Sequence, residues 1–272
     1  MNSLRSEQPI GIFDSGVGGL TVANAIKLLL PNEDMIYFGD TAHLPYGEKS
    51  AETIQYYSEK ISDFLLSHDC KVVLIACNTA SAVAYESVAR HVGDRAIVLN
   101  VIEPVVETIA AMREHKKIGV IGTKTTINSS TYTKKIRKTR PDVEVHALAT
   151  PLLVPMIEEG FIFDDISNAI IRSYLSNSIL ATIDALVLGC THYPIIKNQI
   201  SKFFNFKVDI LDSATIVATS LRKILVDKKL RNTKEGSLRK FYVSDYTENF
   251  KVISRMFFEE SIDLHKLSLW NK

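Results

Sequence analysis

The chain has 272 residues, of which 46% are hydrophobic and 23% are charged, and this composition excludes wholesale disorder. At about 150 residues per domain, such a length predicts two lobes. Its 32 Lys and Arg residues nearly balance its 31 Asp and Glu residues. The resulting net charge of +1 excludes the strongly basic surface that is typical of nucleic-acid or acidic-membrane binding.

The chain contains three cysteines: Cys70, Cys77 and Cys190. A low and odd number indicates a reducing compartment rather than a disulfide framework. The first residues lack the apolar run of a signal peptide, and no stretch reaches about 18 apolar residues without a charge. We therefore expect a cytoplasmic protein without a membrane span.

Short apolar runs rich in β-branched residues alternate with longer amphipathic segments. The runs predict strands at 10–13, 35–38, 72–75, 96–99, 118–121, 143–147, 185–188, 208–211 and 241–244. The longer segments predict helices at 18–30, 50–67, 80–91, 103–114, 126–138, 164–181, 193–203, 213–228 and 246–258. Strands without polar alternation are typical of parallel sheets buried on both faces. We therefore expect an α/β fold in which helices flank a mostly parallel sheet in each lobe.

The sequence also repeats part of its own pattern. IGIF before Asp14 resembles IGVI before Gly122, and the apolar run before Cys77 resembles the run before Cys190. The similar offsets predict that the chain joins two related βα modules. We expect lobe one to comprise 1–99 plus 209–272 and lobe two to comprise 100–208.

Small polar residues follow many of the predicted strands. They are Asp14 and Ser15; Gly39 and Asp40; Cys77, Asn78 and Thr79; Gly122 and Thr123; and Cys190, Thr191 and His192. Ligands of open parallel sheets bind beyond the carboxyl ends of the strands, where helix N-termini favour anions. The pattern therefore predicts a site for a small anion, particularly a dicarboxylate. The glycine loop 14–19 fits neither of two nucleotide-binding fingerprints. G-x-x-x-x-G-K-[ST] is absent, and the third glycine of G-x-G-x-x-G is replaced by Thr21.

Two of the cysteines stand out by their position. Cys77 and Cys190 each end an apolar run and open a helix, a place that is expected to lower a thiol pKa from about 8.5. Two thiols on facing lobes could remove a proton from one face of a carbon and return it on the other. Asp14 and His192 are candidates for setting their protonation states. We expect Cys70 to be an ordinary core residue, and also expect structural roles for His43, His68, His91, His115, His146 and His265.

Three other functions remain open from the residues alone. A cysteine hydrolase or transferase would need one thiol and a His192 base, and it would leave the second thiol idle. A metal site could be built from Cys77, Cys190, His192 and Asp14, although a Cys-x-His spacing is poor for zinc. A two-lobed binding or sensor protein would use the same cleft without needing a cysteine.

Five motifs carry a resemblance to a known family. They are FDSGVGGL (13–20), YFGD (37–40), PYG (45–47), ACNTA (76–80) and LGCTHYP (188–194). Together and in this order, they resemble the glutamate racemases of the cofactor-independent aspartate/glutamate racemase superfamily. The resemblance runs from about residue 10 to 212, and residues 213–272 carry no matching motif.

The resemblance implies interconversion of L- and D-glutamate without a cofactor or metal, for peptidoglycan synthesis. It also implies two pseudo-symmetric α/β lobes with the active site in the cleft between them. It implies catalysis by Cys77 and Cys190, assisted by Asp14, His192 and the Glu158 of PLLVPMIEEG. The implied substrate contacts are Asp14, Ser15, Tyr46, Gly47, Asn78, Thr79, Thr123, Thr126, Thr191 and His192. Family members often form homodimers. The nearest alternative is a racemase of aspartate or a related amino acid from the same superfamily.

Overall fold

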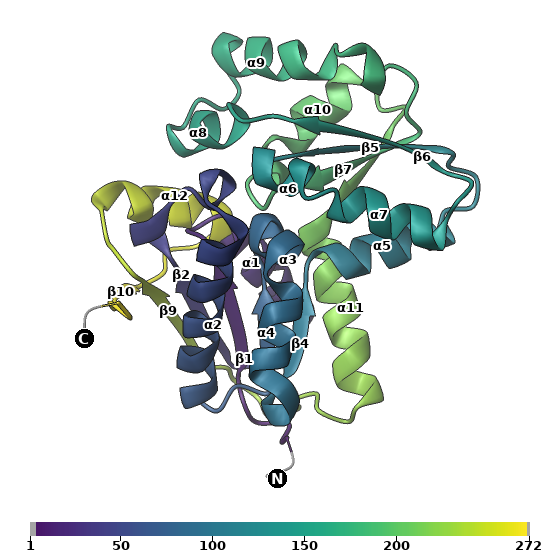
Figure 1. Cartoon of the computed structure of the whole chain (residues 1–272). Helices are drawn as coiled ribbons and strands as arrows, with labels where there is room; N and C mark the ends of the chain where they lie inside the picture. The colour runs from purple at the N-terminus through teal and green to yellow at the C-terminus, as the bar shows by residue number, and fades with distance from the viewer. Residues whose placement is uncertain (1–3, 271–272) are drawn as a thin grey trace.

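A computed structural model describes residues 4–270 and contains two parallel β-sheets in two lobes (Figure 1). The first sheet has the order β10-β9-β2-β1-β3-β4 and the second has the order β6-β5-β7-β8. The first comprises β1 (Ile10–Asp14), β2 (Met35–Gly39), β3 (Val72–Ile75), β4 (Ile97–Asn100), β9 (Arg239–Val243) and β10 (Leu264–Lys266). The second comprises β5 (Lys117–Gly122), β6 (Glu144–Ala149), β7 (Ala185–Gly189) and β8 (Asp209–Asp212). The α/β fold with two parallel sheets is confirmed.

The two lobes share one strand order. In the first four strands of each lobe, the first strand lies between the second and third, and the fourth flanks the third. Cys77 therefore follows the third strand of its lobe, and Cys190 follows the third strand of the other. This equivalence explains the internal repeat in the sequence, since both cysteines occupy the same place in two similar modules.

Helices cover both faces of the sheets (Figure 1). They are α1 (Leu20–Leu29), α2 (Ala51–Ser67), α3 (Asn78–Val83), α4 (Tyr85–Val92), α5 (Ile102–Ala111), α6 (Lys124–Asn128), α7 (Thr131–Thr139), α8 (Leu153–Glu158), α9 (Asp165–Leu175), α10 (Lys197–Phe203), α11 (Ser213–Asp227) and α12 (Glu248–Phe258). Short 3₁₀ turns lie at Thr41–His43, Tyr46–Glu48, Gly93–Arg95, Ser178–Leu180 and Tyr193–Ile196.

Several predicted helices are divided in the structure. The helix predicted at 80–91 breaks at Ala84 into α3 and α4. The one predicted at 126–138 breaks at Ser130, whose left-handed backbone (φ 57°) cannot continue a right-handed helix. The helix α8 lies in a segment for which we predicted no helix. The helices α3, α6 and α8 have only five or six residues each. Apolar periodicity cannot be recognised over so few turns, so the sequence does not reveal where such short helices begin and end.

The chain returns to the first lobe through α11, which packs against α1 of the first lobe and α5 of the second. Before this return, β8 pairs with β7, with Ala185 opposite Asp209. The predicted boundary between 208 and 209 is therefore wrong by one strand, because β8 completes the second sheet before the chain crosses. Otherwise the division into 1–99 plus 209–272 and 100–208 stays a prediction.

The larger cluster of buried apolar side chains contains residues of both lobes, so the lobes share part of their core. The smaller cluster lies between the first sheet and the helices α2, α3 and α4, which cover one of its faces. Across residues 4–270, no helix is both long enough and apolar enough to cross a membrane.

Candidate active site

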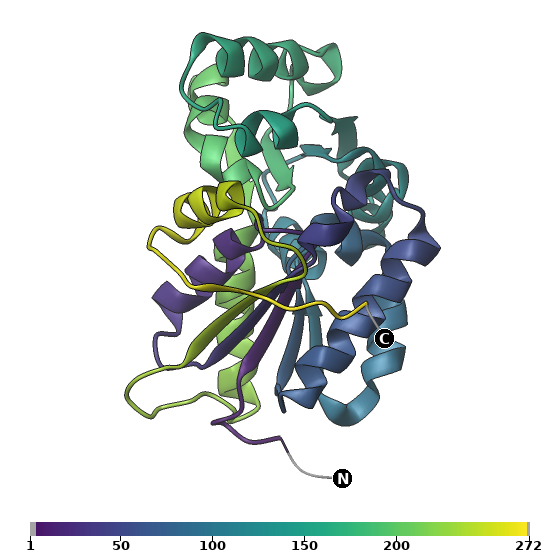
Figure 2. The same ribbon diagram turned by 90° about the vertical axis from the view of Figure 1, so that its left-hand side faces the viewer.

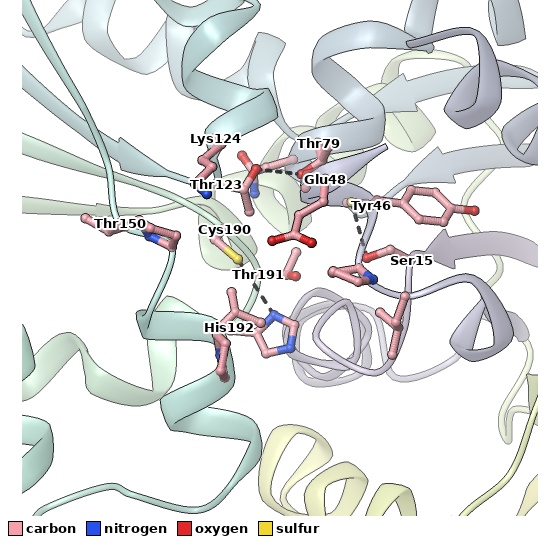
Figure 3. A pocket seen from close by; sticks show the side chains of 18 of the residues that line it. Ser15, Tyr46, Glu48, Thr79, Thr123, Lys124, Thr150, Cys190, Thr191 and His192 are labelled. Carbon is pink, nitrogen blue, oxygen red and sulfur yellow. Dashed lines mark hydrogen bonds between the residues drawn. The ribbon is translucent and has the colours of Figure 1, made fainter. Parts of the chain in front are cut away.

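Both sheets direct the carboxyl ends of their strands toward one pocket of about 220 Å³ (Figure 3). Its lining includes most of the residues that the sequence singled out: Ser15, Tyr46, Gly47, Cys77, Asn78, Thr79, Thr123, Glu158, Cys190, Thr191 and His192. Strand ends that lie more than 100 residues apart in the chain thus converge on a space suited to a small molecule.

Two of the predicted site residues, Asp14 and Thr126, lie behind the pocket lining. Asp14 is fully buried, and its Oδ2 accepts hydrogen bonds from the backbone N–H of Gly16 (3.2 Å) and Gly19 (2.9 Å). Thr126 is also buried and lies 3.2 Å from the Thr79 hydroxyl and 3.0 Å from the Thr123 hydroxyl. Both residues are therefore placed to support lining residues from behind.

The surroundings of Cys77 have opposing effects on its thiol, and those that keep it protonated are the stronger. Its Sγ caps α3 by accepting from the backbone N–H of Ala80 (3.4 Å), and it lies 3.6 Å from the Ser15 hydroxyl. Burial, followed by the negative charge of Asp14, nonetheless raises the pKa of Cys77 to about 12. The expectation that the helix N-terminus would lower this pKa is wrong, because desolvation and a like charge outweigh the short helix.

Cys190 has a different neighbour. Its Sγ lies 3.7 Å from Nδ1 of His192, whose Nε2 lies 2.9 Å from a Glu158 carboxylate oxygen. Burial alone lowers the pKa of His192, but its hydrogen bonds to Cys190 and Glu158 outweigh burial and raise that pKa to about 10. His192 is thereby held as an imidazolium with its Nδ1 next to Cys190 Sγ.

Polar groups from both lobes meet in the pocket. The hydroxyls of Thr79 from the first lobe and Thr123 from the second lie 3.0 Å apart (Figure 3). Asn78 accepts a 2.7 Å hydrogen bond at Oδ1 from the hydroxyl of Tyr132. Its buried Nδ2 has no hydrogen-bond partner among the residues described. Tyr132 thus orients the Asn78 amide so that its N–H donors are free for a carboxylate.

The sequence interpretation missed several lining residues. Glu48 and Lys124 bring opposite charges to the pocket from the first and second lobes, and Thr150 follows β6 (Figure 3). Apolar lining comes from Leu44, Pro45, Pro151, Val154 and Pro155. Glu48 directly follows the PYG motif and Lys124 directly follows Thr123, so proximity to predicted residues was the available signal.

The arrangement also bears on the alternatives. Within the described part of the chain, no group of three or more His, Cys, Asp and Glu side chains is arranged to hold a metal ion. A single-thiol hydrolase would use Cys190 and His192, yet Cys77 lines the same pocket. The geometry is that of two thiols with different polar neighbours facing one small cavity.

Comparison with known proteins places this site in a family. The family model for Asp/Glu/hydantoin racemases matches residues 20–221. The chain is 44% identical to the glutamate racemase of Geobacter metallireducens over 262 residues, which cover 96% of each chain. It is 40% identical to that of Neisseria meningitidis serogroup C over 264 residues, which cover 97% of each chain.

Solved structures agree with these sequence relatives. The glutamate racemase of Francisella tularensis, solved in complex with D-glutamate, superposes with a TM-score of 0.91 at 40% identity. That match covers 97% of this chain and 99% of the other. The motifs, the fold and the two-cysteine pocket agree with these matches, and the chain therefore belongs to the Asp/Glu/hydantoin racemase family, among its glutamate racemases.

Proposed function

We propose that this protein interconverts L- and D-glutamate by a two-base mechanism that uses Cys77 and Cys190. The observation that carries the proposal is that two thiols line one pocket, with Cys77 beside the Ser15 hydroxyl and Cys190 beside the His192 imidazole. The named relatives and the D-glutamate complex of the Francisella tularensis enzyme support glutamate as the substrate.

In one direction, the Cys190 thiolate takes the α-proton and becomes a thiol. The electron pair left on the α-carbon spreads into the adjacent carboxylate. The Cys77 thiol then donates its proton to the opposite face of the carbon and becomes a thiolate. In the other direction the two cysteines exchange these roles, so one proton is removed and one is returned in each turnover.

The remaining polar groups hold the substrate and stabilise the negative charge that develops. The Asn78 amide and the hydroxyls of Ser15, Thr79 and Thr191 are placed to donate hydrogen bonds to the carboxylates. Such fixed donors act more strongly in a buried pocket than in water. Glu158 acts through His192 by stabilising its protonated form.

The decisive experiment follows the α-proton. Incubation of L-glutamate in D₂O without added cofactor should produce D-glutamate, detected by circular dichroism, with deuterium at the α-carbon. A parallel incubation with L-aspartate separates the glutamate racemase from an aspartate racemase. Inversion without deuterium incorporation would exclude proton abstraction, and the absence of any inversion of glutamate would overturn the proposal.

We also propose that the D-glutamate produced serves peptidoglycan synthesis. Deletion of the gene should then create a requirement for external D-glutamate. Cytoplasmic location and homodimer formation remain predictions. Fractionation of cells and light scattering of the purified protein test them.

A further inference from the structure

One wall of the pocket is formed by residues 41–48, which we call the pocket loop. This loop supplies five consecutive lining residues: Leu44, Pro45, Tyr46, Gly47 and Glu48. It is built from two short 3₁₀ turns rather than from a strand or a long helix. Because the loop belongs to neither sheet, contacts with neighbouring segments hold it in place, among them the 2.7 Å hydrogen bond from the Thr125 hydroxyl to the Gly47 carbonyl.

A buried carboxylate holds the pocket loop from behind. Asp40 is fully buried and accepts hydrogen bonds from the hydroxyls of Tyr46 (2.7 Å) and Ser244 (2.8 Å). Nδ1 of His43 lies 2.8 Å from the same carboxylate. A carboxylate can only accept, so His43 carries a proton on Nδ1 and donates it. His43 and Tyr46 are thus joined through one acceptor.

The outer side of the loop is covered by the end of the chain. Residues 267–270, which we call the tail, follow β10 and cross toward α2 (Figure 2). The ring of Trp270 packs edge-on against the rings of His43 and of Tyr57 in α2, with ring centroids 4.7 Å and 4.9 Å apart. His43 itself stacks on Tyr57 at 4.1 Å. The tail therefore packs over His43, whose ring is hydrogen-bonded to Asp40.

We propose that Trp270 and His43 are positioning residues for substrate binding. Trp270 packs edge-on against His43 and Tyr57, and His43 is hydrogen-bonded to Asp40. Asp40 in turn holds the Tyr46 hydroxyl behind the pocket wall. The proposal rests on the proposed function, because its effect is measured on glutamate. It also assigns a role to part of the C-terminal region, where the sequence showed no matching motif.

The expected effect is on binding more than on chemistry. Loss of the aromatic clamp loosens the loop in the free enzyme, so glutamate must order the loop when it binds. This cost is the same in the substrate complex and in the transition state, relative to the free enzyme. We therefore expect Trp270→Ala to raise KM for both enantiomers about three- to tenfold, with kcat changed by less than about twofold. Trp270→Phe keeps an aromatic ring over His43 and should restore most of the affinity.

Steady-state kinetics of five variants tests the role of Trp270 and His43. Trp270→Ala should show the raised KM, and Trp270→Phe should lie near the wild type. His265→Ala, at an exposed position of β10, is the control and should have the KM of the wild type. A wild-type KM for Trp270→Ala would overturn the proposal, as would an effect of equal size in His265→Ala. His43→Ala should reproduce Trp270→Ala, whereas His43→Asn, which can still donate to Asp40, should be milder.

Fluorescence gives a readout independent of turnover. Trp270 is the only tryptophan of the chain, so the emission reports the tail alone. Saturating glutamate should fix the pocket loop and reduce quenching of this emission by iodide. Equal quenching with and without glutamate would overturn the coupling. A wild-type protein that does not racemise glutamate would overturn the proposed function itself, whereas normal racemisation with an unchanged Trp270→Ala overturns only the role of the tail.

Discussion

Single residues with the same local sequence setting differ in their chemistry. Cys77 and Cys190 each end a buried strand, yet Cys77 faces buried Asp14 and Cys190 faces His192. Cys70 is also buried, and its pKa is likewise raised to about 12, but it lines no part of the active-site pocket. Burial alone therefore does not mark a reactive thiol, and the neighbouring groups decide what each cysteine can do.

Removal of either pocket thiol should stop racemisation. We expect Cys77→Ala and Cys190→Ala each to lower kcat at least about 100-fold, because each removes one of the two acid–base groups. The assay is circular dichroism of glutamate. Cys70→Ala is the matched control and should retain wild-type kcat. Normal turnover in either pocket variant would contradict the two-base mechanism.

The protonated His192 predicts a pH-dependent stability. The unfolded chain loses this proton near pH 6.5, whereas the folded chain holds it up to about pH 10. The stabilisation is therefore fully present below about pH 6.5 and is lost as the pH rises toward 10. Urea unfolding of wild type and His192→Asn should show a stability difference that shrinks between these pH values. A difference that is constant with pH would contradict the shifted pKa.

At the scale of elements, the loop between β1 and α1 reaches across to the second lobe. A Cβ atom built on Gly18 would lie 2.4 Å from Nδ1 of His192 and 2.6 Å from Oγ1 of Thr191. The hydroxyl of Thr21, at the start of α1, donates to the backbone carbonyl of Thr191 at 3.0 Å. The absence of a side chain at Gly18 thus allows the first lobe to support the His192 segment.

Gly18→Ala should therefore displace His192 from Cys190. We expect kcat to fall about 100-fold, because small misplacements of acid–base groups have effects of this size. Steady-state kinetics measures the loss. Gly11→Ala in β1 is the control: its added Cβ would lie 3.0 Å from Cys70 Sγ, so it strains packing away from the pocket. Equal loss of kcat in both variants would contradict a specific effect on His192.

On the scale of the whole molecule, a buried ion pair between Lys71 and Glu33 joins distant segments at the amino ends of the strands of the first sheet, opposite the pocket. Lys71 donates to Glu33 Oε2 (2.6 Å), to the Leu230 carbonyl (2.9 Å) and to the Ser6 carbonyl. The other Glu33 oxygen accepts from the backbone N–H of Asn232 (2.7 Å). The pair thus ties the N-terminal segment, β3 and the end of α11 together.

Breaking this pair should destabilise the fold without altering the chemistry. Lys71→Met leaves Glu33 buried without its partner and should lower the free energy of unfolding by about 3–5 kcal/mol. Urea denaturation measures this loss, while KM and kcat of the folded variant stay near wild type. The double variant Lys71→Met/Glu33→Gln should recover part of the stability. A single variant as stable as the wild type would refute the role of the pair.

The sequence by itself determined the α/β class, the two-module pattern and most pocket residues. These features follow from local patterns, because apolar runs make buried strands and polar residues after parallel strands gather at one edge. The strand ends carrying Ser15, Cys77 and Cys190 were therefore recognisable without coordinates. The family motifs added Tyr46 and Glu158, which lie on segments without a periodic signal.

Only the tertiary structure decided how these residues act on one another. The raised pKa of Cys77 depends on complete burial, and that of His192 depends on Glu158 from 34 residues away. Packing between distant segments likewise determines the place of β8 in the second sheet, the hydrogen bond from Tyr132 to Asn78 and the position of the tail over His43. Local periodicity says which face of an element is buried, whereas protonation and orientation depend on what is packed against it.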